Sequence, residues 1–128
     1  MALSMIALLL AQAASDLPVR VPLGEVPLPA PKSVERVIVM RVNFAPGQAM
    51  PAHVHPAPVV CLVETGSFDV RIGDAPARTV HVGEVTLEPA NVPVGWFRNL
   101  SATSPASLVC TFLAGHDDHE ISRMLPGR

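Results

Sequence analysis

The chain has 128 residues, a length that suits one domain rather than two. Hydrophobic residues make up 49% of it, but aromatic residues only 4%, so aliphatic side chains must build most of the core. The net charge is −2 and no run of Lys or Arg occurs. Nucleic-acid binding needs a basic face, so the composition argues against a nucleic-acid partner.

The N-terminus predicts an export signal. Residues 2–14 carry no charged side chain, and Ala11-Gln12-Ala13 places small residues where a signal peptidase cleaves. The apolar run is too short for a membrane-spanning helix, which takes about 20 residues. We therefore expect a signal peptide at residues 1–13, no membrane span, and a periplasmic or secreted protein. A mis-assigned start or a buried first helix is the alternative, because no Lys or Arg precedes the run.

Residues 14–33 form a proline-rich arm. Each of its five prolines removes a backbone donor and fixes φ, which argues against a helix. Apolar residues from Leu17 to Leu28 alternate with the prolines and polar residues. An extended arm that packs along a sheet edge, or crosses to a second copy in a homodimer, fits this pattern best.

From Val34 onward the pattern is that of β-strands. In residues 34–44 the apolar side chains alternate, so that Ile38, Met40 and Val42 share one face. Gly, Pro, Asn and Asp turns separate the segments, which predicts a sandwich or a small antiparallel barrel. Only residues 117–125 are compatible with a short helix. The expected strands are 34–44, 59–63, 67–72, 78–82, 85–89, 94–98 and 108–113.

The sharpest chemical signal is the pair His53 and His55. Side chains alternate along a strand, so the two imidazoles point to the same face. Two imidazoles on one rigid strand make half of a metal site. A pair of surface histidines is the alternative for this pattern taken alone.

The surroundings of this pair resemble the two conserved motifs of the cupin superfamily. Four residues match the first motif in spacing: Gly47, His53, His55 and Gly66. Gly83 and Pro89 match the second motif, and Asn99 follows one residue late, which suggests a β-bulge. The resemblance covers roughly residues 34–113. It implies an all-β fold, a small antiparallel β-barrel or double-stranded β-helix, over residues 34–114, followed by a polar tail at 115–128.

Three positions depart from the cupin pattern. The glutamate ligand of the family falls at Val59 and its last histidine ligand at Val94. The turn glycine falls at Asn91, a residue type that tolerates positive φ. The resemblance therefore implies a metal site reduced to His53 and His55. Stable sites need three or four protein ligands, so we expect weak binding of one divalent metal such as Zn, Fe, Ni or Mn.

Other residues are candidates for the missing ligands. Cys61 lies two residues beyond Val59 and should face the same interior. His116 and His119 reach the site if the tail folds over the barrel mouth. The alternatives are a small core residue for Cys61 and a solvated tail. An exported protein can bridge Cys61 to Cys110, although we slightly favour two buried free thiols.

The pocket beside the histidines is expected to hold a small molecule. Trp96 lies two residues after Val94, so both side chains face the cavity if that strand is regular. The alternative role for Trp96 is packing. Arg98 faces the same way and would meet an anionic ligand, or it is simply solvated. Glu88 flanks apolar Leu87 and is expected at the surface or rim. The predicted lining is Met50, Val59, Cys61, Val94, Trp96 and Arg98.

Three functions remain open. The first is an exported cupin that binds a small molecule without catalysis, since a barrel of this size encloses one small ligand. The second is a metal-dependent dioxygenase or isomerase that uses the histidines with a non-standard third ligand. The third is a structural, dimeric module. The fold does not decide among them, because one scaffold hosts many chemistries, and no residue is assigned a catalytic role.

Overall fold

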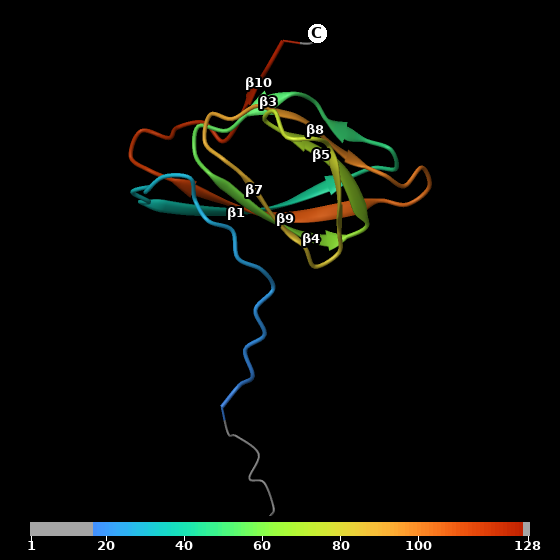
Figure 1. Ribbon diagram of the computed structural model, residues 1–128, viewed down its shortest axis with the longest axis horizontal. Coiled ribbons are helices and arrows are strands. Elements are labelled where there is room, and N and C mark those ends of the chain that lie inside the picture. The colour runs from blue at the N-terminus through green and yellow to red at the C-terminus, as the bar shows by residue number, and fades with distance from the viewer. Residues whose placement is uncertain (1–16, 127–128) are drawn as a thin grey trace, which may run out of the picture.

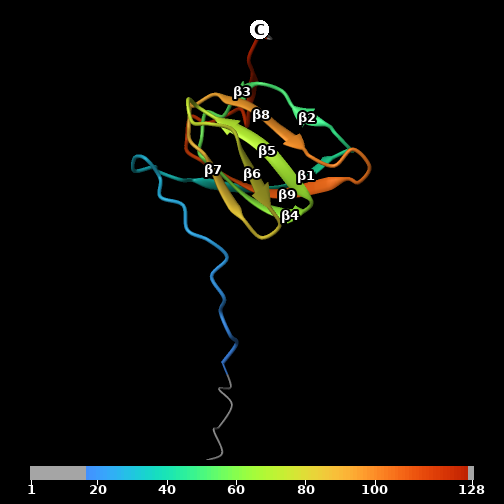
Figure 2. The ribbon, with the colours of Figure 1, turned by 45° about the vertical axis from the view of Figure 1, so that its right-hand side comes forward.

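The protein is described by a computed structural model over residues 17–126, so the expected signal peptide at 1–13 lies outside the described residues. The regular structure of the described part is entirely β, and two antiparallel sheets face each other around the core (Figures 1 and 2). None of the described residues forms a helix that is long and apolar enough to cross a membrane. The strands are β1 (Arg36–Phe44), β2 (Ala49–Met50), β3 (His53–Val54), β4 (Val59–Thr65), β5 (Ser67–Ile72), β6 (Arg78–His81), β7 (Val85–Glu88), β8 (Val94–Asn99), β9 (Ala106–Ala114) and β10 (Arg123–Met124).

The first sheet has the strand order β1-β9-β4-β7, and its register places inward-facing residues in rows across the strands. Directly paired residues point to the same face, so each row presents its side chains to the interior together. One row is Ile38, Phe112, Val59 and Glu88. The next row is Met40, Cys110, Cys61 and Thr86. These two rows form the floor of the site described below.

The second sheet has the strand order β10-β3-β8-β5-β6, with β2 also paired to β8. Its strand β8 carries a β-bulge, because Arg71 pairs with Trp96 whereas the next residue, Ile72, pairs with Val94. Gly95 is therefore the extra residue. A bulge inserts one residue and reverses the facing of those that follow. This bulge accounts for the late position of Asn99 and confirms the irregularity that the sequence suggests.

Three of the four phenylalanines pack together between the two sheets. Phe44, Phe68 and Phe97 have ring centroids 5.0–6.3 Å apart, in edge-to-face or tilted arrangements. All three are buried. The fourth, Phe112, instead packs against the imidazole of His55, with ring centroids 5.6 Å apart. The aromatic cluster therefore fills one part of the interior, and Phe112 lies beside His55.

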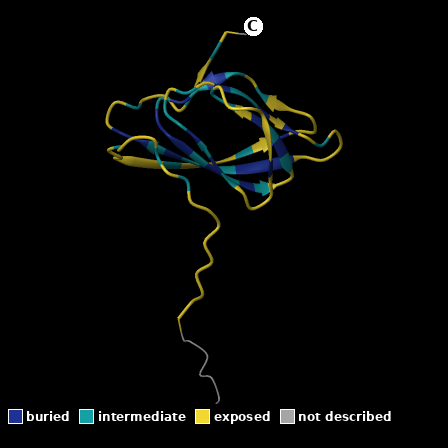
Figure 3. Ribbon diagram, viewed as in Figure 1, coloured by how far each residue is buried: buried dark blue, intermediate teal, exposed yellow. Residues whose placement is uncertain are grey.

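The N-terminal arm is extended, as expected, and its first part runs away from the barrel (Figures 1 and 3). It contacts the edge strand β7 at Gly24, where an added Cβ would lie 2.9 Å from a methyl carbon of Val85. Beyond this contact Val26 and Leu28 are half-buried. Before it Val19 is 87% exposed. The expected packing along a sheet edge therefore applies to the second part of the arm only.

The C-terminal residues 115–125, here called the C-terminal strap, fold back over the barrel. Residues 117–125 are compatible with a short helix by sequence, but they form none, and the strap instead contains β10, which pairs with β3. Asp118 fixes the strap, because its carboxylate accepts a hydrogen bond from the Gly115 amide at 2.7 Å and forms an ion pair with Lys32. Arg36 donates to the Asp118 carbonyl at 2.6 Å. Of the two alternatives left open for the tail, solvation or folding over the barrel, the second applies to the part that contains β10.

Candidate metal centre

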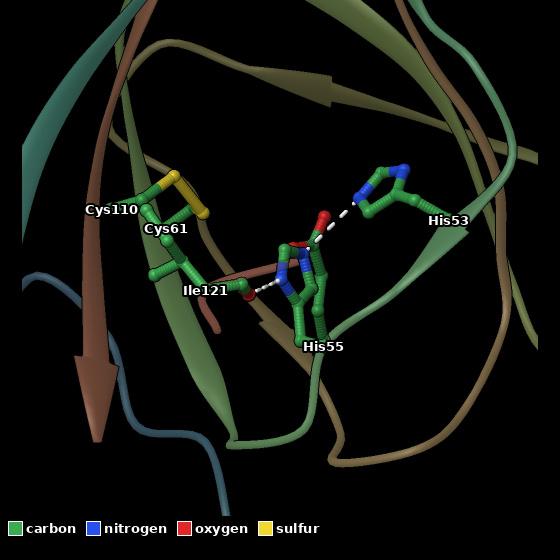
Figure 4. Close-up of a disulfide and its surroundings, with 6 residues drawn as sticks. His53, His55, Cys61, Cys110 and Ile121 are labelled. Atoms are coloured by element: carbon green, nitrogen blue, oxygen red, sulfur yellow. Dashed lines mark hydrogen bonds and ion pairs between the residues drawn. A yellow bond between two sulfur atoms is a disulfide. The ribbon is translucent and has the colours of Figure 1, made fainter. Parts of the chain in front are cut away.

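Three buried side chains converge on one point inside the barrel. They are His53, His55 and Glu88, and their donor atoms all lie within 4.8 Å of one another. His53 belongs to β3, His55 directly follows it, and Glu88 ends β7 on the opposite sheet. Figure 4 shows both imidazoles extending into the space between the sheets. Sequence reasoning found the two histidines and missed the carboxylate.

Hydrogen bonds to the backbone fix the tautomers of both imidazoles. His53 Nδ1 lies 2.7 Å from the Pro51 carbonyl oxygen, and His55 Nδ1 lies 2.7 Å from that of Ile121. A carbonyl only accepts, so each Nδ1 carries a hydrogen and donates it. In a neutral ring of this tautomer, Nε2 carries no hydrogen and offers its lone pair. The two Nε2 atoms are 3.1 Å apart. Such backbone bonds to the remote nitrogen orient histidines that bind metals.

Glu88 supplies the carboxylate that the cupin pattern places at Val59. The two residues are directly paired between β7 and β4, and a Glu88 oxygen lies 2.8 Å from His55 Nε2. The expected surface position of Glu88 is wrong. Its neighbour Leu87 points outward but is half-buried, as is Val85, which touches Gly24 of the arm. Because both faces of β7 are covered, alternation of apolar residues does not reveal which face is inside.

The charge balance of the site raises the pKa of His55. Burial of the imidazole lowers its pKa, but the hydrogen bond to Glu88, the hydrogen bond to the Ile121 carbonyl and the negative charge of Glu88 together raise it above its ordinary value of 6.5. Without a metal, Glu88 therefore favours a proton on His55 Nε2. A cation bound by the same atoms would replace this proton.

The donor set fits a divalent transition metal. Two imidazole nitrogens and one carboxylate are ligands that Zn²⁺ and non-haem iron both accept, and three protein ligands leave positions open for water or another molecule. The carboxylate also offsets part of the positive charge of the metal. The expectation of a site reduced to two histidines is therefore corrected to one with three candidate ligands.

Cys61 is bridged to Cys110, so the expectation of two free thiols is wrong. The two residues are directly paired on β4 and β9, with their Cα atoms 4.0 Å apart. Opposed residues in an antiparallel pair come this close where no backbone hydrogen bonds join them. A sulfur held in a disulfide is at best a weak ligand, so Cys61 does not complete the donor set in this state.

His116 and His119 stay away from the centre. Both are exposed on the outer side of the strap. His116 Nδ1 instead lies 3.3 Å from a carboxylate oxygen of Glu35. The strap contributes a backbone group rather than these imidazoles, since the Ile121 carbonyl accepts from His55.

A cavity of about 190 Å³ adjoins the three donors. Met50, Val59 and Cys61 line it, as the sequence suggests, together with Phe97, Leu108 and other apolar residues. Ile121 and Ser122 of the strap form part of its wall. No Lys or Arg side chain of residues 17–126 lines it. The cavity is therefore an apolar space with one polar, anionic corner.

Three residues expected in the pocket are absent from its lining. Val94 is fully buried and paired with His53, but it is not part of the lining. The bulge at Gly95 turns Trp96 to the outer face, where its indole donates to Asp69 at 2.8 Å. Arg98 is exposed and lies 3.7 Å from Asp69. The expected facing of Trp96 and Arg98 is wrong because it assumes a regular strand, whereas β8 has a bulge at Gly95.

The turn after β7 behaves as the sequence suggests. Asn91, at the position of the family's turn glycine, has a φ of 59°. Its amide donates to the His55 carbonyl at 2.7 Å. The turn that carries β7 into β8 is thereby attached to the residue following β3. Asparagine tolerates this backbone conformation better than most residues, so the loss of glycine leaves the turn intact.

Comparison with known proteins places the chain in the cupin family, because the Cupin domain model matches residues 40–112. An oxalate oxidase in complex with the substrate analogue glycolate is 30% identical, with a TM-score of 0.56, covering 61% of this chain and 42% of that chain. The fold is shared by the oxalate decarboxylase of Bacillus subtilis, with 20% identity and a TM-score of 0.62 over 72% of this chain and 24% of that chain. It is also shared by a DMSP lyase of Ruegeria pomeroyi, with 17% identity and a TM-score of 0.58 over 69% of this chain and 42% of that chain. The chain spans less than half the length of each. No curated protein matches it significantly.

Proposed function

We propose that this protein binds one divalent transition metal through His53, His55 and Glu88 and uses it to hold a small molecule in the adjoining cavity. The observation that carries the proposal is the orientation of the two imidazoles. Each donates its Nδ1 hydrogen to a backbone carbonyl and directs its Nε2 toward the other and toward a buried carboxylate. Two imidazole nitrogens and one carboxylate that converge in a buried space form a donor set of the kind that divalent transition metals accept.

The cavity favours a small molecule that is mostly apolar. An apolar cavity of about 150 Å³ is large enough for benzene, and this one measures about 190 Å³. Since no Lys or Arg of the described part of the chain lines the cavity, the metal would be the main positive charge available to a ligand. A neutral or singly charged molecule with one oxygen donor and an apolar body fits this environment better than a small dianion does.

Catalysis is the second candidate function. A metal held by three protein ligands keeps positions open, as catalytic sites do, whereas structural sites are closed by four. When bound, the metal would act as a Lewis acid on an oxygen of the ligand. The chain itself would orient that ligand against the apolar wall formed by Val59, Leu108 and Phe112 and keep bulk water out.

Export of the protein is also proposed. The Cys61–Cys110 disulfide supports it, since such bonds persist in oxidising compartments. The mature chain should begin near Ala14, after the apolar segment at the N-terminus. N-terminal sequencing of the native protein tests this, and an intact Met1 in a cytoplasmic fraction would refute it.

The metal proposal is tested on untagged protein by metal analysis and by competition with a chromophoric chelator for Zn²⁺. The wild type should bind one equivalent. The Glu88→Gln and His53→Ala variants should each bind at least about tenfold more weakly, within the range seen when groups around a metal are removed. Glu84→Gln is the matched control, because Glu84 is an exposed carboxylate just before the same strand. Equal affinity in the wild type and Glu88→Gln would reject the site.

A further inference from the structure

The disulfide is part of the wall of the cavity that holds the candidate metal centre. Cys61 and Cys110 both line this cavity, and Figure 4 shows the bridge in the same interior space as His55. In the sheet, the row that contains the cysteines is adjacent to the row that contains Val59 and Glu88. The sulfur atoms therefore lie one row from the carboxylate that the metal would bind.

Thr86 adds a second observation in the row that contains the cysteines. It is directly paired with Cys61, so both side chains point inward. Its side chain is buried, and its hydroxyl has no hydrogen-bond partner among the described residues. A disulfide sulfur is only a weak acceptor, whereas a thiol also has an S–H donor. Reduction of Cys61 would therefore place an S–H donor in the same row as the Thr86 hydroxyl.

The strand order distinguishes the two cysteines. Cys61 is on β4, next to β7 with Glu88, whereas Cys110 is on β9, one strand further away. Cys61 also lies two residues from Val59, the position where the cupin pattern places a ligand. Once released from Cys110, the Cys61 side chain is the sulfur donor nearest to Glu88 in this sheet.

From this juxtaposition we propose that the Cys61–Cys110 disulfide is a redox switch of the metal centre, whose reduction adds Cys61 to the ligands of His53, His55 and Glu88. The proposal rests on the metal site proposed above. A dithiol reductant supplies two electrons and two protons: the protein S–S bond breaks, two thiols form, and the reductant becomes a disulfide. On binding a divalent metal, the Cys61 thiol forms a sulfur–metal bond and its proton passes to solvent.

The switch would change which metal the site prefers. With the disulfide intact, the donors are nitrogen and oxygen atoms, which many divalent ions accept. A sulfur ligand shifts the preference toward ions that favour thiolates, such as Zn²⁺. It also occupies a position that is otherwise open to a small molecule. Reduction would therefore tighten metal binding and hinder binding of the cavity ligand.

Co²⁺ is the probe for this proposal, because a cobalt–thiolate bond gives a strong near-ultraviolet charge-transfer absorption that nitrogen and oxygen ligands lack. The oxidised protein and protein reduced anaerobically with a phosphine, which is then removed, are each titrated with Co²⁺ and Zn²⁺. We expect the absorption only after reduction, together with at least about tenfold tighter Zn²⁺ binding, or about 1.4 kcal/mol.

Two single variants serve as matched controls. Cys110→Ser leaves Cys61 as a free thiol and should show the absorption without any reductant. Cys61→Ser leaves Cys110 free and should not show it. Equal absorption in the two variants, or none in reduced wild type and Cys110→Ser, would overturn the assignment of Cys61. Failure of the oxidised protein to bind either ion would instead reject the underlying His53, His55 and Glu88 site, so the two failures are distinguishable.

Thr86→Val provides a readout that does not involve metal. This nearly isosteric change removes the hydroxyl that the reduced Cys61 would contact. In a glutathione redox titration, it should shift the disulfide toward the oxidised form relative to wild type. An unchanged equilibrium would show that the Thr86 hydroxyl does not sense the state of Cys61.

Discussion

Glu88 lies directly opposite Val59 in the antiparallel pair of β7 and β4. The cupin pattern places a carboxylate at Val59, and here the carboxylate projects from its partner on the neighbouring strand. Side chains of directly paired residues start only about 4.5–5.5 Å apart, so either position brings a carboxylate to the same part of the interior. Restoring glutamate at Val59 would set two carboxylates against each other, which leaves Val94 as the position for an added ligand.

Val94→His should therefore strengthen metal binding. Val94 is paired with His53, so an imidazole there would project to the same side of the sheet as the His53 ring. A fourth ligand should tighten Zn²⁺ or Ni²⁺ binding by about tenfold or more, that is, by at least about 1.4 kcal/mol. Chelator competition measures the change.

Val94→Leu is the control for this variant, since it enlarges the same buried side chain without adding a donor. It should lose some stability through overpacking and leave metal affinity unchanged. If both variants bind metal as the wild type does, the interior facing of Val94 is wrong.

The pH dependence of stability should change sign when metal binds. In the metal-free protein the pKa of His55 is raised above 6.5, so its protonation stabilises the folded state below that pH. This contribution is lost as the pH rises through the raised pKa. A metal competes with the same proton, so metal binding and its stabilising effect increase over the same interval.

Calorimetry across this pH range, with and without a chelator, measures both curves. The melting temperature should fall with rising pH for the metal-free protein relative to Glu88→Gln, which lacks the carboxylate that raises the pKa. The metal-loaded protein should show the opposite trend. Parallel curves with and without metal would mean that His55 is not a ligand.

Removal of the disulfide should destabilise the fold. The bridge joins residues 49 apart in sequence. For a loop of this length the chain-entropy model gives a loss of about 4 kcal/mol. Denaturant unfolding of the Cys61→Ala, Cys110→Ala double variant tests this. Reductant should lower the unfolding midpoint of the wild type and leave the double variant unchanged, and an unmoved midpoint for verifiably reduced wild type would contradict the expectation.

The arm should mediate formation of a homodimer. Val19 and Val21 are 87% and 71% exposed, and Val37 and Val39 on the outer face of β1 are 60% and 61% exposed. Exposed apolar surface of this kind marks contact sites. Val19→Glu with Val21→Glu should shift the protein toward a monomer in light scattering, whereas Arg20→Gln, between them in sequence, should not. A wild-type monomer at all concentrations would refute the prediction.

The sequence predicted the fold well because its strongest signals are local. Alternation over residues 34–44 and the spacing from Gly47 to Gly66 depend only on neighbours in the chain, and the structure confirms the all-β architecture. The late Asn99 also indicated a bulge correctly. Its consequence for Trp96 did not follow, because a single inserted residue reverses the facing of a strand and the sequence does not show where it is inserted.

Glu88 and the disulfide escaped prediction because both depend on contacts between strands. Outward-facing Leu87 and Val85 are apolar because the arm and the sheet partly cover them, so the usual distinction between inner and outer faces is lost. The missing carboxylate at Val59 was itself a usable signal, since it directs attention to the strand beside it. Pairing of Cys61 with Cys110 required the register of β4 and β9, which hydrophobic patterns alone do not supply.

The C-terminal strap is synthesised last, and this order matters for the metal centre. The acceptor that fixes the tautomer of His55 is the Ile121 carbonyl, 66 residues later in the chain. During translation every other strand of both sheets emerges before β10 does. The metal centre therefore acquires its final proton arrangement only when nearly the whole chain has been made. A product that stops before Ile121 lacks the carbonyl that orients His55 Nδ1, although it contains every candidate metal ligand and the strands β1 to β9, so complete synthesis is coupled to completion of the site.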